Sequence, residues 1–192
     1  MILGVLLGLV LLAAISFGGI YNSLVQGEEA VKAAWAQVEN VYQRRLDLIP
    51  NLVETVKGYA AHERETLQAV VEARAKISQM NVTPEVVNNP ETLAKFQAAQ
   101  GNLSSALSRL LVVIEQYPDL KANQNFLALQ AQLEGTENRI AVERMRYNEV
   151  AQSFNTTRRI FPNVIVASLM GFREKAYFKA DEAASKAPKV QF

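Results

Sequence analysis

The N-terminal part of the chain is a long uninterrupted apolar run. Residues 2–20 contain no charged side chain, and no Asp, Glu, Lys or Arg precedes Glu28. At 1.5 Å per residue a helix over this run is about 28 Å long, close to the ~30 Å hydrocarbon core of a bilayer. The run predicts a single transmembrane anchor over residues 1–25. Tyr21 then lies at the membrane interface, where aromatic side chains are common.

The same run has a second interpretation, a cleaved signal peptide, because the small residues Ser16 and Gly18 resemble a cleavage site. A signal peptide normally begins with Lys or Arg, which this run lacks, so we favour an uncleaved anchor. The few basic residues near the run leave the side of the membrane open. Gly4 and Gly8 form a GxxxG pattern, a candidate for self-association between two such helices, although glycine is also common in membrane spans.

Beyond Glu28 the apolar residues recur at spacings of three and four, which is typical of amphipathic helices, and no segment alternates with a period of two. Prolines separate the periodic segments. The pattern predicts helices over residues 26–80, 90–116, 118–161 and 163–180, and a loose tail over 181–192. The expected fold is all-α, an N-terminal transmembrane helix followed by an antiparallel four-helix bundle of long helices over residues 26–180.

The first predicted helix carries one apolar stripe along its whole length. The stripe comprises Val31, Trp35, Val38, Tyr42, Arg45, Ile49, Leu52, Val56, Tyr59, Glu63, Leu67, Val70, Arg74 and Ile77. Its register persists through Pro50, which removes one hydrogen bond to the carbonyl of Leu46. We therefore expect one helix that is kinked at Pro50. A break into two helices is the alternative.

The lengths of the predicted helices leave part of this stripe uncovered. The first helix is about 80 Å long and the second about 40 Å, so the second ends near the level of Leu46 or Leu52. Residues 31–42 would then expose Val31, Trp35, Val38 and Tyr42, and an exposed apolar stripe indicates a partner. Candidate partners are another copy of the protein, the membrane surface and the C-terminal segment with Phe172, Tyr177 and Phe178. We favour self-association.

Charged residues also occupy stripe positions. They are Arg45 and Glu63 on the first helix, and Glu137, Arg144 and Arg158 on the third. Charges at a helix seam are costly unless they are paired, and such pairs fix the register of the helices. We expect a buried ion-pair layer. The alternatives are Arg side chains with buried stems and solvated heads, and a binding site for a charged ligand.

The composition excludes several classes of function. The chain has 20 Lys and Arg against 19 Asp and Glu, which argues against nucleic acid as the main partner. It has no Cys and one His, which excludes disulfides, Cys-ligated zinc and the HExxH motif. His62 lies beside Glu63 and Glu65 and is read as a partly exposed helix residue. We expect no catalytic residue, metal or cofactor.

Four blocks of the sequence resemble the LemA family of bacterial membrane proteins. They are YNSLV at 21–25, RRLDLIPNLVETVKGYAAHE at 44–63, YPDLKANQNFLALQAQLEGTENRIAVERMRYNEVAQSFN at 117–155 and FPNVIVASLMGF at 161–172. The resemblance implies one N-terminal membrane helix and a compact bundle of four helices. It implies no enzyme activity and no catalytic residue. Some relatives are associated with membrane remodelling or organelle formation, and others are encoded near membrane proteases.

These observations together predict a single-pass protein of the bacterial inner membrane. Its partners would be the lipid bilayer and further copies of itself. It would act as a non-catalytic, self-associating scaffold in the cell envelope or in membrane organisation. The alternative is a sensor or regulatory adaptor that binds a ligand or a neighbouring membrane protein such as a protease.

Overall fold

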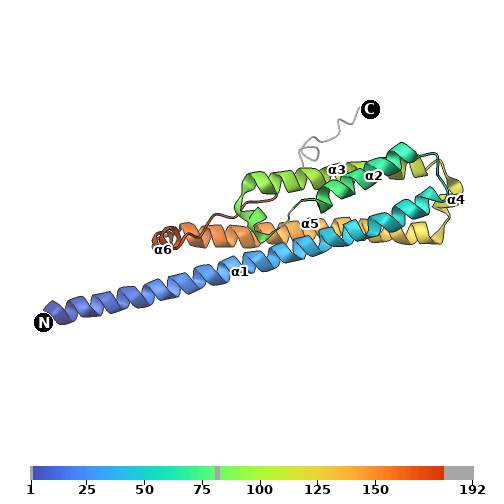
Figure 1. Cartoon of the computed structure of the whole chain (residues 1–192). Coiled ribbons are helices and arrows are strands. Elements are labelled where there is room, and N and C mark those ends of the chain that lie inside the picture. Colours follow the sequence, from blue (N-terminus) through green and yellow to red (C-terminus); the bar gives the residue numbers. More distant parts are fainter. Residues whose placement is uncertain (1, 81–82, 180–192) are drawn as a thin grey trace, which may run out of the picture.

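The computed structural model describes residues 2–80 and 83–179 and contains only helices and irregular segments there (Figure 1). The elements are α1 (Ile2–Lys57), α2 (Arg64–Ser78), the short 3₁₀-helix η1 (Pro84–Asn88), α3 (Pro90–Ile114), α4 (Pro118–Lys121), α5 (Gln124–Arg159) and α6 (Asn163–Met170). Residues 172–179 are non-helical. The all-α fold with a long apolar N-terminal helix is confirmed, and the predicted tail over 181–192 lies outside the described residues.

The first part of α1 projects from the bundle (Figure 1). Its large apolar side chains are exposed; Leu3 is 82% exposed and Ile15 71%. Within residues 2–80 and 83–179, α1 is the helix that is long and apolar enough to cross a membrane. From Leu24 onward one face of the same helix is buried in the bundle. The projecting segment and the central helix of the bundle are therefore one element.

The helix α1 continues through Pro50, as predicted, but it ends at Lys57. The prediction of one helix over 26–80 is wrong, because the chain turns at residues 58–63 and α2 runs back along α1. Gly58, a poor helix former, opens this turn, and the buried Ala60 donates its N–H to the carbonyl of Val56 at 2.8 Å. The apolar spacing continued through the turn because α2 has its own buried stripe of Leu67, Val70 and Ile77.

The returning α2 also satisfies the backbone group that Pro50 leaves without a helical donor. Proline has no N–H, so the carbonyl of Leu46 cannot accept the usual bond from the residue four positions later. The Nε of Arg74 on α2 donates to this carbonyl at 3.0 Å. The exposed Pro50 is thus compatible with a continuous α1, because a second helix supplies the donor that the carbonyl of the buried Leu46 lacks.

The turn after α1 reverses the direction of every later helix relative to the prediction. The helix α3 runs beside α2 and parallel to α1, and α5 then descends antiparallel to α1. Partners along α1 and α5 show this direction: Arg45 meets Glu137, Trp35 meets Tyr147, and Gly27 meets Phe154. The helix predicted over 118–161 is divided into α4 and α5. The helix predicted over 163–180 ends at Met170, where Gly171 adopts a left-handed conformation with φ of 78°.

The interior consists of two apolar clusters separated by a polar layer. The cluster nearer the projecting end of α1 includes Trp35, Tyr42, Phe96, Ile140 and Tyr147. The cluster at the distal end includes Leu46, Ile49, Leu103, Leu110 and Leu133. On α1, α3 and α5 the residues between the two clusters are Arg45, Gln100 and Glu137. A polar layer at one level of three helices fixes their relative register, because a shift would bury these groups in apolar surroundings.

Candidate functional site

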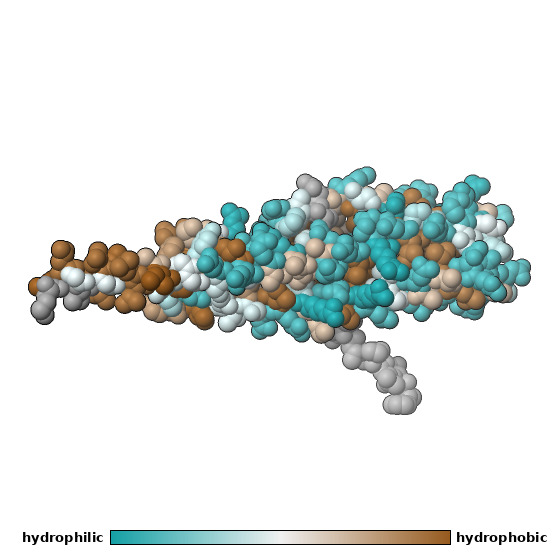
Figure 2. Space-filling view, turned by 90° about the horizontal axis from the view of Figure 1, so that it is seen from below, coloured by the Kyte–Doolittle hydropathy of each residue, from teal (hydrophilic) through white to brown (hydrophobic). Residues whose placement is uncertain are grey.

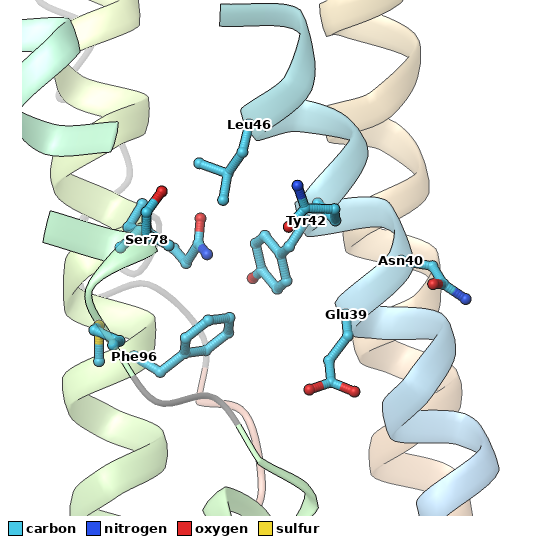
Figure 3. Close-up of a pocket in the computed structure, with 10 residues that line it drawn as sticks. Glu39, Asn40, Tyr42, Leu46, Ser78 and Phe96 are labelled. Atoms are coloured by element: carbon cyan, nitrogen blue, oxygen red, sulfur yellow. The ribbon is translucent and has the colours of Figure 1, made fainter. Parts of the chain in front are cut away.

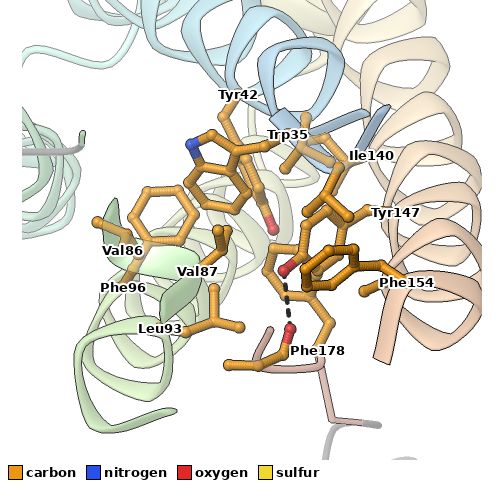
Figure 4. Packing of buried hydrophobic residues seen from close by; sticks show 14 of the residues in the cluster. Trp35, Tyr42, Val86, Val87, Leu93, Phe96, Ile140, Tyr147, Phe154 and Phe178 are labelled. Carbon is orange, nitrogen blue, oxygen red and sulfur yellow. Dashed lines mark hydrogen bonds between the residues drawn. The ribbon is translucent and has the colours of Figure 1, made fainter. Parts of the chain in front are cut away.

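The stripe over residues 31–42 is covered within the chain itself (Figure 4). Trp35 is fully buried, and its ring lies 5.7 Å from that of Phe96, 5.8 Å from Tyr147 and 6.0 Å from Phe178, measured between centroids. Val31, Val38 and Tyr42 are buried in the same cluster. The prediction that this stripe is exposed is wrong, because α5 descends along α1 and the C-terminal segment covers the remaining side. The exposure that favoured self-association through this stripe is therefore absent.

The C-terminal segment over residues 172–179, here called the strap, is held by side-chain amides. Asn155 accepts from the N–H of Lys175 at 2.8 Å and donates to the carbonyl of the same residue at 2.9 Å. Asn148 makes the same pair of bonds with Phe178, both at 2.9 Å. An amide has both a donor and an acceptor, so it pairs with a backbone residue as a neighbouring strand would.

The middle of the strap is fixed by Ala176. The Tyr147 hydroxyl donates to the carbonyl of Ala176 at 2.8 Å. The N–H of Ala176 donates to the carbonyl of Val87 in η1 at 2.7 Å. Burial raises the pKa of Tyr147 far above its ordinary value of 10, so the hydroxyl keeps its proton and remains a donor at any physiological pH. The backbone of the strap is therefore bonded on both sides, while Phe178 fills the core.

A buried lysine in the strap was missed by the sequence analysis. Lys175 is 2% exposed, and its Nζ donates to Glu28 at 2.6 Å and to Asn88 at 2.7 Å. The Nζ also lies 5.3 Å from the centroid of the Phe154 ring. A buried ammonium group requires such partners. This ion pair joins the strap to the first charged residue of α1.

The polar layer centres on Arg45, which is 1% exposed. Its guanidinium donates to Glu137 at 2.6 Å, to Ser104 at 2.9 Å and to the side-chain oxygen of Gln100. Two members of the predicted ion-pair layer, Arg45 and Glu137, are thus paired with each other. Gln100 and Ser104 were not among the predicted site residues, although the position of Gln100 on the apolar stripe of its helix was a usable signal.

The other three charged residues of the predicted layer lie elsewhere, so the five do not form one layer. Glu63 accepts from the Tyr117 hydroxyl at 2.8 Å near the distal end. Arg144 donates to the carbonyl of Lys179 at 2.8 Å and lies 4.9 Å from the centroid of the Phe178 ring. Arg158 pairs with Glu174 at 3.3 Å. Arg144 and Arg158 therefore hold the strap, because the reversed helix directions place α5 beside it.

A family-wide comparison adds to this geometry. The model of the LemA family matches residues 34–192. The chain belongs to the LemA family. The matched part of this LemA-family chain begins within α1 and includes Trp35, the Arg45 network and the strap. It excludes Glu28, the partner of Lys175, and the whole apolar run over residues 2–20.

Individual relatives of this LemA-family chain are distant in sequence. The chain is 27% identical to Magnetosome protein MamQ 2 of Paramagnetospirillum magneticum, over 85% of the chain and 66% of that protein. It is 26% identical to Protein LemA of Metamycoplasma hominis, over 85% of the chain and 71% of that protein. It is also 26% identical to Magnetosome protein MamQ of Magnetospirillum gryphiswaldense. The chain thus spans just under two thirds of the length of the MamQ 2 relative.

Two pockets flank the polar layer of this LemA-family protein. One, of about 450 Å³, lies between α1, α2 and α3, and Figure 3 shows Glu39 and Tyr42 of α1 facing Phe96 of α3 across it. The other, of about 440 Å³, is lined by Arg45, Gln100 and Glu137. Burial raises the pKa of the Glu39 carboxyl above 4.5, and the indole N–H of Trp35 offsets this rise only in part.

The remaining predicted residues lie along α1 and in the turn that follows it. Tyr21 is half-buried, and its ring centroid lies 5.9 Å from that of Phe172 in the strap. Gly4 and Gly8 have open space where a Cβ would lie, so their role in self-association stays a prediction. His62 is exposed in the turn between α1 and α2 rather than in a helix. Over the described ranges, no group of three His, Cys, Asp or Glu residues is placed to hold a metal ion.

Proposed function

We propose that this protein is a single-pass scaffold of the bacterial inner membrane, which organises membrane assemblies by self-association and without catalysis. The observation that carries the proposal is the continuity of α1, whose apolar projecting segment and buried bundle segment form one helix of 56 residues. A protein built this way holds its bundle at a fixed position relative to the bilayer. Fixed placement suits a scaffold, which must present its surfaces reproducibly.

The buried charged residues, which join elements of the fold to one another, support the same proposal. Arg45 is bonded to α3 and α5, and Lys175 joins the strap to α1. These charges connect elements of the fold, which gives them a structural role. The relatives named as magnetosome proteins also support a role in membrane organisation.

The contact between copies is proposed to lie in the apolar segment of α1. The stripe over residues 31–42 is already buried within one chain. Gly4 and Gly8 share one face of α1, and among the described residues nothing beyond their neighbours in the same helix lies within 4 Å of the Cβ position of either. Small residues spaced in this way let two membrane helices approach closely.

The test is the mass of the full-length protein extracted from membranes in mild detergent. We expect a discrete oligomer for the natural chain and dissociation when Gly4→Ile and Gly8→Ile are combined. Ala14→Ile is the matched control, because it adds a similar side chain to an exposed small position of the same helix. A natural chain that is monomeric in detergent and when crosslinked in the membrane would refute self-association.

A second candidate is a sensor or adaptor, and it is favoured by the two pockets that flank Gln100. Both are of a size that suits small ligands. This candidate predicts a monomer or dimer that retains a small molecule or a second membrane protein through purification. Native mass spectrometry of the same detergent extract separates the two candidates, because a scaffold gives a mass that is a whole multiple of the chain.

A further inference from the structure

The helix α6 is apolar on two sides. Its inner side packs into the bundle through Val166 and Ala167, which are 4% and 1% exposed. Its outer side carries Ile165 and Leu169, which are 58% and 73% exposed, and the preceding turn presents Phe161 at 80%. A surface helix normally has a polar outer face, whereas a helix that is apolar all round has apolar surroundings. The outer side of α6 therefore requires a second apolar environment.

The position of α6 identifies that environment. It lies at the end of the bundle from which α1 projects (Figure 1), and the strap residue Phe172 joins it to Tyr21 of α1. The uncharged run of residues 2–20 is about 28 Å long as a helix, which matches a bilayer core, so Tyr21 lies at its boundary. The hydrophobic surface of α1 continues onto this end of the bundle (Figure 2). The apolar side of α6 is thus level with the membrane boundary.

Basic side chains lie on both sides of this apolar surface. Arg159 ends α5 immediately before the turn, and Arg173 follows Gly171 after α6; both are exposed. Arginine beside an apolar surface is typical of proteins that bind the interfacial region of anionic membranes. The charge and the apolar surface therefore favour the same partner, a lipid bilayer.

We propose that α6 and the turn before it form a membrane-contact surface, in which Phe161, Ile165 and Leu169 enter the interface of the bilayer that α1 spans. The inference rests on the membrane anchoring proposed above but not on self-association. The bundle then has two contacts with one membrane, the span of α1 and the apolar side of α6. The apolar face of a helix that binds a membrane interface in this way is buried about 5 to 10 Å into the boundary between headgroups and acyl chains.

The absence of natural cysteine makes the test direct. Single-cysteine variants of the full chain carry one environment-sensitive fluorophore and are placed in nanodiscs, one copy each, of phosphatidylcholine with or without phosphatidylglycerol. Leu169→Cys reports on α6. Val112→Cys is the matched control, an apolar position that is 70% exposed near the distal end of α3, and Val10→Cys reports on the span. Quenching by lipids that carry a nitroxide measures contact with the bilayer.

We expect the label at residue 169 to be quenched several-fold more strongly than the label at residue 112, and more so with phosphatidylglycerol. Equal quenching at 169 and 112, with strong quenching at 10, overturns the membrane contact of α6 and leaves the anchor intact. If the label at residue 169 is quenched no more than the label at 112 in one-copy nanodiscs, but its emission shifts to shorter wavelength in nanodiscs prepared with two copies, this surface belongs to a second chain, which also overturns the membrane contact. Weak quenching at residue 10 overturns the anchoring on which both proposals rest.

Discussion

The indole ring of Trp35 stacks on the phenyl ring of Phe178, with centroids 6.0 Å apart and planes inclined by 19°. This contact joins the centre of α1 to the end of the strap. Phe178→Ala should lower the free energy of unfolding by about 3 to 5 kcal/mol, the usual cost of removing a buried phenyl ring. Trp35 is the only tryptophan, so the fluorescence of the protein reports on this site. In Phe178→Ala the emission of Trp35 should shift to longer wavelength, and iodide should quench it.

Two further variants make this prediction specific. Phe178→Leu keeps most of the apolar volume and should recover much of the stability. Val112→Ala removes apolar atoms from an exposed position and should change neither the stability nor the Trp35 emission. Unchanged Trp35 emission in Phe178→Ala would mean that the strap does not cover Trp35 in solution.

The Arg45–Glu137 pair should contribute more to the free energy of unfolding than the exposed ion pairs do. Removing the carboxylate with Glu137→Ala leaves a buried guanidinium without its charged partner. Because Glu137 is 43% exposed and water can replace part of the interaction, we expect a loss of about 1 to 3 kcal/mol, below the cost in a fully buried pair. Chemical denaturation checks this value, with the exposed Glu134→Ala one turn away as control. A loss no larger than that of the control would contradict a structural role for the layer.

The stability contributed by Glu39 should depend on pH. Its pKa is raised above 4.5 in the folded chain, mainly by burial, so the folded state binds the proton more tightly than the unfolded state. The contribution of this group is therefore most favourable below pH 4.5 and falls as the pH rises through the folded pKa. Glu39→Gln should be more stable than the natural chain at pH 7, with a difference that diminishes below pH 4.5. The exposed Glu65→Gln tests whether removing any carboxylate has this effect.

Gly27 should tolerate a side chain less well than a glycine elsewhere in the bundle. A Cβ at this position would lie 3.0 Å from the ring of Phe154, which Phe172 and Lys175 contact from other sides. Gly101 is also within a helix, but beyond its own helical neighbours no described residue would lie within 4 Å of its Cβ. Gly101→Ala should therefore raise the stability by about 1 kcal/mol through helix propensity, and Gly27→Ala should gain less or lose. Equal gains in thermal unfolding would show that Phe154 yields freely.

The sequence predicted the helical class and the long apolar helix because both depend on local patterns. It did not predict the end of α1 at Lys57, since the apolar spacing of α2 continues that of α1 without an interruption. This one turn determines the direction of α3 and α5, and the error therefore propagated to the neighbours of Trp35. Periodicity records which face of a helix is buried, but it does not record which element covers that face.

The candidate site was predictable only where both partners occupied stripe positions. Arg45 and Glu137 met this condition, and the structure pairs them. Lys175 did not, because it lies in the non-helical strap, where side-chain orientation follows from bonds to Asn155 and Asn148 rather than from a helical period. Such contacts depend on tertiary structure and leave no regular spacing in the sequence.

Because α1 is continuous, a change in the inclination of its apolar segment would also rotate the part of α1 inside the bundle. The part of α1 beyond Tyr21 is about 54 Å long at 1.5 Å per residue. Membrane helices are inclined by about 20° on average, and the inclination increases when the bilayer becomes thinner than the apolar segment. An inclination of about 20° would displace the far end of α1 by about 18 Å relative to an upright helix, because α1 is continuous between the two parts. The distal end of the bundle, which includes the turn at residues 58–63, would thus move much farther than the end near Tyr21 when the thickness of the bilayer changes (Figure 1).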